Sequence, residues 1–165
     1  MILAAFAAAS LAAAEPAPAE VPLGEAAHAL EAGRVGQARA MIANAVKAGA
    51  SGPALDRLLA DLAFASGDFA AALPRYQALL LAHPGEARLY ERAGISALRL
   101  RDVGQAARLL DKGIAMPGAS WRAWNARGIA ADFQREWGKA DAAYARAEAL
   151  HPGRAEVLNN MGWSK

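Results

Sequence analysis

Residues 121–154 read WRAWNARGIAADFQREWGKADAAYARAEALHPGR, and this stretch decides the fold of the chain. Two alanine-rich segments, Trp121–Phe133 and Trp137–Leu150, are separated within it by a short polar turn. Proline cannot continue the hydrogen-bond ladder of a helix, so Pro152 ends the second segment. The stretch therefore predicts two helices that are joined by a tight turn and closed by a proline.

The same pattern recurs along the chain with a strict period of 34 residues. Alanine repeats without slippage at one place in the period, at Ala38, Ala72, Ala106 and Ala140. Counted from Ala19, the period defines four registers and a partial fifth: 19–52, 53–86, 87–120, 121–154 and 155–165. A period of this length indicates stacked helix pairs, because each repeat is one supersecondary unit.

Small and bulky apolar residues alternate at fixed places in these registers. Position 8 is always small: Ala26, Ala60, Gly94, Gly128 and Gly162. Position 24 is always bulky: Ile42, Tyr76, Leu110 and Tyr144. Small residues let two helices approach closely and bulky neighbours fill the remaining space, which is what a dense core requires. We therefore predict an all-α solenoid that is stabilised by nearest-neighbour contacts.

The second register shows how the two helices of each pair are separated by a turn. Gly67 and Asp68 separate the helices that we expect over Ala54–Ala65 and Phe69–Leu81. Glycine adopts positive φ readily and can end the first helix, while aspartate can cap the second. Pro74 lies inside that second helix and removes one backbone hydrogen bond. We expect a kink or a late helix start to absorb it.

Signature residues of a known family stand at the repeated positions. The fourth register carries nearly all of them: Trp124, Gly128, Trp137, Ala140, Tyr144, Ala147 and Pro152. The second matches through Gly67, Asp68, Phe69, Ala72, Tyr76 and Pro84, and the third through Tyr90, Gly94, Asp102, Ala106 and Pro117. The first register is degenerate, with Pro22 where an aromatic residue is usual. The chain thus resembles the tetratricopeptide repeat family over residues 19–165.

This resemblance implies a fold and a role. The fold is a right-handed superhelix of antiparallel helix pairs, here about four and a half repeats, whose first helices line a concave groove. The implied role is the binding of other proteins, as a scaffold or adaptor. Aromatic residues at signature positions are expected in the core: Phe69, Tyr76, Trp124, Trp137 and Tyr144.

The amino-terminal residues read as a targeting segment rather than as fold. Residues 1–14 carry no charged side chain, and their length fits the apolar region of a signal peptide, with small residues following. They are too short for an ordinary membrane-spanning helix, which needs roughly 20 apolar residues. Glu15–Pro22 reads as an extended spacer. We expect residues 1–19 to hold a leader and the start of this spacer, with membrane contact only through an uncleaved leader.

Export and setting follow as expectations. The apolar leader, the alanine-rich repeats and the closing stretch Leu158–Trp163 look like the repeat proteins of tight-adherence (Flp) pilus assembly loci. That resemblance implies a periplasmic or cell-envelope accessory of pilus or secretion assembly in a Gram-negative bacterium. The chain has no cysteine, so it departs from the lipoproteins common in that family, and disulfides and thiolate sites are excluded. A cytoplasmic adaptor with an uncleaved apolar terminus is the alternative.

Polar residues on the first helices are the candidates for partner binding in the groove. Five arginines among them offer bidentate donors to carboxylates, so an acidic or C-terminal peptide segment is the expected guest. The alternative is a solvated helix face on which these charges pair with each other. The candidates are Arg57, Asp61, Arg88, Glu91, Arg92, Arg99, Arg122, Asn125, Asn159 and Asn160.

Other function classes find little support in the sequence. The two-carboxylate clamp of chaperone-binding relatives has Lys and Asn where this chain has Arg57 and Asp61, and Asp61 would repel a carboxylate. His83 and His151 occupy equivalent turn positions, so repetition explains them better than metal binding. The net charge of +2 is spread along the chain, which disfavours nucleic-acid binding. We expect no enzyme activity, cofactor or metal; the rival hypothesis is the interaction portion of an envelope enzyme whose catalytic domain lies beyond residue 165.

Overall fold

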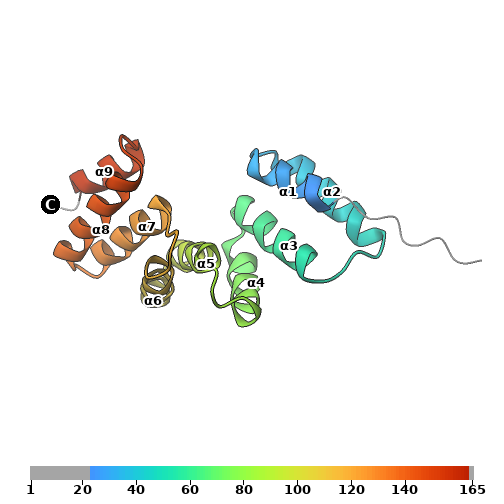
Figure 1. Cartoon of the computed structure of the whole chain (residues 1–165), viewed down its shortest axis with the longest axis horizontal. Helices are drawn as coiled ribbons and strands as arrows, with labels where there is room; N and C mark the ends of the chain where they lie inside the picture. The colour runs from blue at the N-terminus through green and yellow to red at the C-terminus, as the bar shows by residue number, and fades with distance from the viewer. Residues whose placement is uncertain (1–22, 164–165) are drawn as a thin grey trace, which may run out of the picture.

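The computed structural model describes residues 23–163, and all regular secondary structure in this part of the chain is helical (Figure 1). The expected leader and the whole spacer, Glu15–Pro22, lie outside the described residues. Nine helices fill the described range: α1 (Leu23–Glu31), α2 (Val35–Lys47), α3 (Pro53–Ala65), α4 (Phe69–Ala82), α5 (Ala87–Arg99), α6 (Val103–Ile114), α7 (Trp121–Phe133), α8 (Trp137–Leu150) and α9 (Ala155–Trp163).

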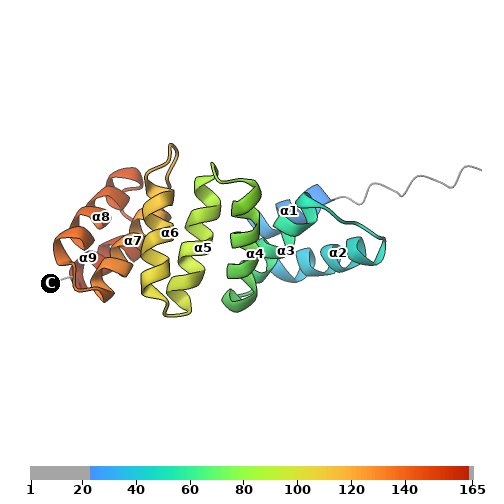
Figure 2. The same ribbon diagram turned by 90° about the horizontal axis from the view of Figure 1, so that it is seen from below.

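The helices are stacked as pairs in an elongated array (Figures 1 and 2). Within each pair, α1 packs on α2, α3 on α4, α5 on α6 and α7 on α8. Between pairs, each second helix packs on the next first helix, and the first helices α1 and α3, and α5 and α7, also contact one another. This is the predicted all-α solenoid, in which each pair packs mainly on its neighbours along the chain.

The alternation of small and bulky residues sets how closely the paired helices approach. A Cβ atom on Gly94 would lie 2.6 Å from Leu110 Cγ, and one on Gly128 would lie 2.6 Å from Tyr144 Cδ1. Leu110 and Tyr144 are fully buried. The backbone at these two positions therefore lies directly against the bulky residue of the partner helix, as the sequence pattern predicted.

The turns inside the pairs repeat one backbone geometry. Gly33 and Gly67 have φ of +71° and +78°, and Arg101 and Arg135 occupy the equivalent places with φ of +67° and +60°. The left-handed region costs nothing to glycine but strains a residue with a Cβ atom. Asp68 caps α4 by accepting a hydrogen bond from the amide of Ala71 at 3.0 Å, as expected.

Replacing Arg135 with glycine should stabilise the protein. Arg135 is exposed at a left-handed turn, so Arg135→Gly relieves backbone strain and should raise the free energy of unfolding by about 1 kcal/mol. Arg101→Gly should gain less, because the Arg101 guanidinium also lies 5.2 Å over the ring of Phe133. Urea unfolding of both variants beside the wild type measures this difference. A loss of stability in Arg135→Gly would contradict the strain assigned to this turn.

One sequence-based expectation differs from the structure, and one of two alternatives for Pro74 is excluded. Trp137 is expected in the core but is 50% exposed, because no described helix covers it. Phe69 occupies the same position in the second repeat, and there Arg99 of the following repeat lies over the ring. Pro74 does not delay its helix: α4 begins at Phe69 and runs through the proline. The missing bond falls within the second turn of α4, and the tertiary packing of α4 on α3 and α5 holds the helix across it.

No helix among residues 23–163 is both long and apolar enough to span a membrane.

Candidate functional site

The first helices of the pairs enclose two adjoining hollows that together form a groove. The first, of about 410 Å³, lies between α1, α3 and α5, and the second, of about 530 Å³, lies between α1, α3, α5 and α7. Leu30, Glu31, Arg88 and Arg92 line both hollows, so the two are continuous. We call this surface the groove.

The first hollow has a mainly apolar floor. Its small and aliphatic side chains come from the whole length of α1 and of α3. Guanidinium groups from α3 and α5 stand at the rim of this floor. The apolar lining residues are Leu23, Ala27, Leu30, Ala54, Leu58 and Ala65.

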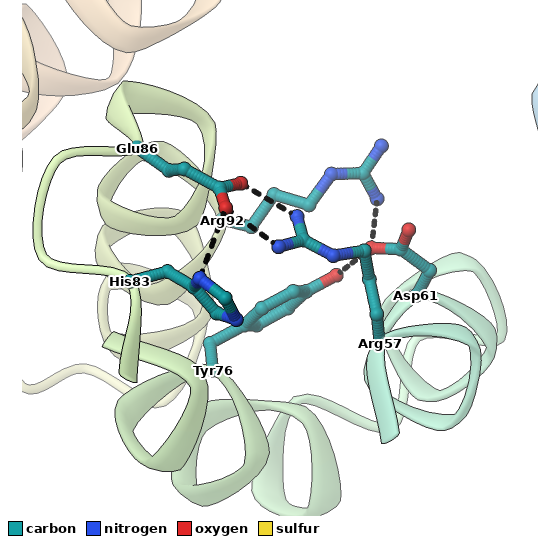
Figure 3. A network of polar contacts seen from close by, with 6 residues as sticks. All are labelled: Arg57, Asp61, Tyr76, His83, Glu86 and Arg92. Carbon is teal, nitrogen blue, oxygen red and sulfur yellow. Dashed lines mark hydrogen bonds and ion pairs between the residues drawn. The ribbon is translucent and has the colours of Figure 1, made fainter. Parts of the chain in front are cut away.

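Two of the predicted groove arginines have carboxylate partners within the chain (Figure 3). Arg57 donates both of its terminal nitrogens to Glu86, at 2.7 and 2.8 Å. Arg92 lies 3.7 Å from Asp61, which also accepts a 2.6 Å hydrogen bond from the Tyr76 hydroxyl. These contacts tie α3 to α4 and to the start of α5, so they hold the groove wall in shape.

The ionisation of this network follows from those contacts. The hydrogen bonds from Arg57 lower the pKa of Glu86, and the same bonds raise the pKa of Arg57. Burial raises the pKa of Tyr76 above its ordinary value, and the nearby charge of Asp61 raises it further. At neutral pH Glu86 is thus ionised and the Tyr76 phenol is neutral. A guest carboxylate would have to compete with Glu86 or Asp61 for these two arginines.

The other predicted groove residues in the hollows are engaged differently. Arg88 is exposed, lines both hollows and makes no ion pair with a carboxylate of the described residues. Glu91 accepts a 2.6 Å hydrogen bond from the Ser120 hydroxyl, across the boundary between two pairs. Arg122 lines the second hollow and lies 4.6 Å over the ring of Trp121. Arg88 is therefore the groove cation with the greatest freedom to meet a guest.

The remaining candidates do not line either hollow. Asn160 donates a 2.9 Å hydrogen bond to Asn125, which joins α9 to α7. Arg99 lies 5.6 Å over the ring of Phe69, and Asn159 is exposed on α9. The structure thus brings six of the ten predicted residues into one groove and places these four outside its lining.

Two features of the surface were not identified from the sequence. The apolar floor is not apparent from the sequence, because Leu and Ala on the first helices are equally compatible with the core of the solenoid. Arg127 of α7 is 8% exposed; its Nε donates to Asp111, while Glu136 lies 3.9 Å from Nη2. Arg127 sits at a register position where the other repeats have no arginine, and its pairing identifies it as an internal tie between α6, α7 and α8.

Comparison with known sequences decides the family. A sequence model described as tetratricopeptide repeat matches residues 23–87, 57–112 and 91–155, which together cover most of the chain. The chain belongs to the tetratricopeptide repeat family. This family is generally a non-catalytic interaction domain, and within the described range no group of three or more His, Asp or Glu residues is placed to hold a metal ion. No curated protein sequence matches the chain significantly.

Solved structures with the tetratricopeptide repeat fold are similar at low sequence identity. The second such domain of human RPAP3, solved in complex with the HSP70 peptide SGPTIEEVD, shares 18% identity at a TM-score of 0.61, covering 66% of this chain and 91% of that one. Pseudomonas aeruginosa pilF shares 16% sequence identity at a TM-score of 0.69, and the match covers 86% of this chain and 65% of pilF. A chain of the APC/C hetero-tetramer Cut9–Hcn1 shares 17% sequence identity at a TM-score of 0.74. The match covers 86% of this chain but only 29% of that one. At these identities the likeness shows the fold alone.

Proposed function

We propose that this protein is a scaffold that binds a segment of another protein in the groove between α1, α3, α5 and α7. The observation that carries the proposal is the continuity of the two hollows, in which an apolar floor adjoins the unpaired Arg88. Apolar floors with a few convergent polar groups are typical of binding sites. The RPAP3 domain of the same fold was solved with a bound peptide, which supports this mode of binding.

The groove favours a segment that is both apolar and acidic. Aliphatic side chains would bury against Leu23, Leu30 and Leu58, and a carboxylate would meet Arg88. Arg57 and Arg92 would contribute mainly by holding the wall through Glu86 and Asp61.

The setting that we propose is the cell envelope of a Gram-negative bacterium, where the scaffold would assist assembly of a pilus or secretion machine. Support for export comes from the charge-free residues 1–14 and the small residues after them. Support for the pilus setting comes from the resemblance of the leader, the alanine-rich repeats and the closing Leu158–Trp163 to tight-adherence proteins. The segment bound would then belong to another component of that machine.

Charge reversal at Arg88 tests the groove. Peptides selected on the wild-type protein from a random display library provide the ligand, and calorimetry measures their affinity. Arg88→Glu should weaken the selected peptide at least about tenfold, or about 1.4 kcal/mol, because it replaces an attraction with a repulsion beside the apolar floor. The fold should be unaffected, since Arg88 is exposed.

The matched control is Arg146→Glu, which makes the same charge change on an exposed site of α8, outside the groove lining. Its affinity should stay within about twofold of the wild type, a free-energy change below about 0.5 kcal/mol. Equal affinities of the Arg88→Glu and Arg146→Glu proteins would place peptide binding elsewhere and refute the groove.

A further inference from the structure

The charge of the residue just before each first helix changes along the solenoid. Before the last three first helices, the preceding residue is Glu86 for α5, Ser120 for α7 and Arg154 for α9. Glu86 and Ser120 each contact a residue of the preceding first helix, Arg57 and Glu91 respectively. This residue is acidic before α5, neutral before α7 and basic before α9, so the boundary between α8 and α9 carries a positive charge at this place.

Arg154 and Arg122 meet on one indole ring. The guanidinium carbon of Arg122 lies 4.6 Å from the ring centroid of Trp121, and that of Arg154 lies 4.5 Å from it. His151 approaches the same ring edge-on, at 5.9 Å between ring centroids. Two cations held on an aromatic ring lose little side-chain freedom when they bind an anion.

The two guanidinium groups are poorly neutralised by the protein. Arg122 makes no ion pair with a carboxylate of the described residues. Arg154 has one carboxylate nearby, that of Glu156 at 3.7 Å, and its buried Nε has no hydrogen-bond partner in the structure. By contrast, Arg57 and Arg92, which line the first hollow, are paired with Glu86 and Asp61.

We infer that the cluster of Trp121, Arg122, His151 and Arg154 binds a group of carboxylates in the bound segment. The inference rests on the proposed function and deepens it. Arg122 belongs both to this cluster and to the lining of the second hollow, so one extended segment can reach both ends. Its apolar residues lie on the floor between α1 and α3, and its acidic residues lie at the cluster between α7 and α9. The partner is thus a protein segment with an apolar part and a separate acidic part.

The random display library used for the groove provides the test. Peptides selected on the wild-type protein should be enriched in Asp and Glu by about threefold or more. Selection on the Arg122→Glu/Arg154→Glu protein should lose that enrichment, and wild-type-selected peptides should bind this variant at least about tenfold more weakly. The matched control is Arg108→Glu/Arg146→Glu, an equal charge change at exposed sites on second helices, which should keep the enrichment.

The outcomes separate this inference from the proposed function. The assignment of the carboxylate site to the cluster is wrong if the selected peptides show no acidic enrichment, or if the enrichment survives in the Arg122→Glu/Arg154→Glu protein. The proposed function still stands in either case if Arg88→Glu weakens peptide binding. If no peptide is selected at all, both proposals fail. Displacement of an acidic peptide by single-stranded DNA at equal concentration would make the cluster a phosphate site and overturn the inference. Should the reversed pair unfold, Arg122→Gln/Arg154→Gln provides the same comparison with a milder change.

Discussion

Gly128→Ala should lower the free energy of unfolding by roughly 2–3 kcal/mol, a large effect for the addition of one methyl group. The new Cβ would lie 2.6 Å from Cδ1 and 2.8 Å from Cζ of Tyr144, well inside van der Waals contact. Tyr144 is fully buried and its hydroxyl is bonded to Asp132, so the ring has no free space into which to move. The methyl group can be accommodated only if α7 and α8 separate.

The matched control is Gly138→Ala in α8. A Cβ at Gly138 would meet nothing within 4 Å, and the residue is exposed. Alanine is a better helix former than glycine, so this variant should be unchanged or up to about 1 kcal/mol more stable. Urea unfolding followed by circular dichroism measures both variants. Equal stabilities of Gly128→Ala and Gly138→Ala would contradict the close approach of α7 and α8.

Tyr76→Ala should lower the free energy of unfolding by roughly 3–5 kcal/mol, the range measured when large aromatic core residues are truncated to alanine. Tyr76 is fully buried between α3, α4 and α5, and it packs edge-on against Phe64 with ring centroids 6.1 Å apart. Its hydroxyl donates the 2.6 Å bond to Asp61, which in turn lies beside Arg92. Truncation therefore removes core volume and one support of the groove wall together.

Tyr76→Phe separates these two contributions. It keeps the ring and removes only the hydroxyl, so it should cost about 1 kcal/mol, since Asp61 keeps Arg92 at 3.7 Å. The same urea titration measures both substitutions. A loss in Tyr76→Phe as large as in Tyr76→Ala would mean that the hydrogen bond, and not the buried ring, dominates, which would contradict the packing described here.

The fold was predictable because it depends on local, repeated signals. The period of 34 residues, the small residue at position 8 and the punctuation at Gly67 and Asp68 locate the helices almost to the residue. α7 and α8 have the predicted bounds, and α3 and α4 each extend one residue further. Such signals suffice because each repeat packs mainly on its neighbours in sequence.

The groove was only partly predictable, because its chemistry depends on contacts between side chains that are distant in sequence. Position in the repeat placed Arg57 and Arg88 on the same surface, but it could not show that Arg57 is bonded to Glu86, 29 residues away. The same applies to the meeting of Arg122 and Arg154 on Trp121. Trp137 was misjudged for a related reason: a signature position indicates a core residue only where a neighbouring helix covers it.

The most direct test of the scaffold is photo-crosslinking from inside the groove in living cells. The photoreactive residue p-benzoylphenylalanine would replace Arg88 in one full-length protein and Arg146 in another, and mass spectrometry would identify the adducts and the mature amino terminus. We expect adducts with a segment of another protein from the Arg88 site and none from the Arg146 site. Adducts from the Arg146 site alone, or from neither site, would contradict the binding of a partner segment in the groove.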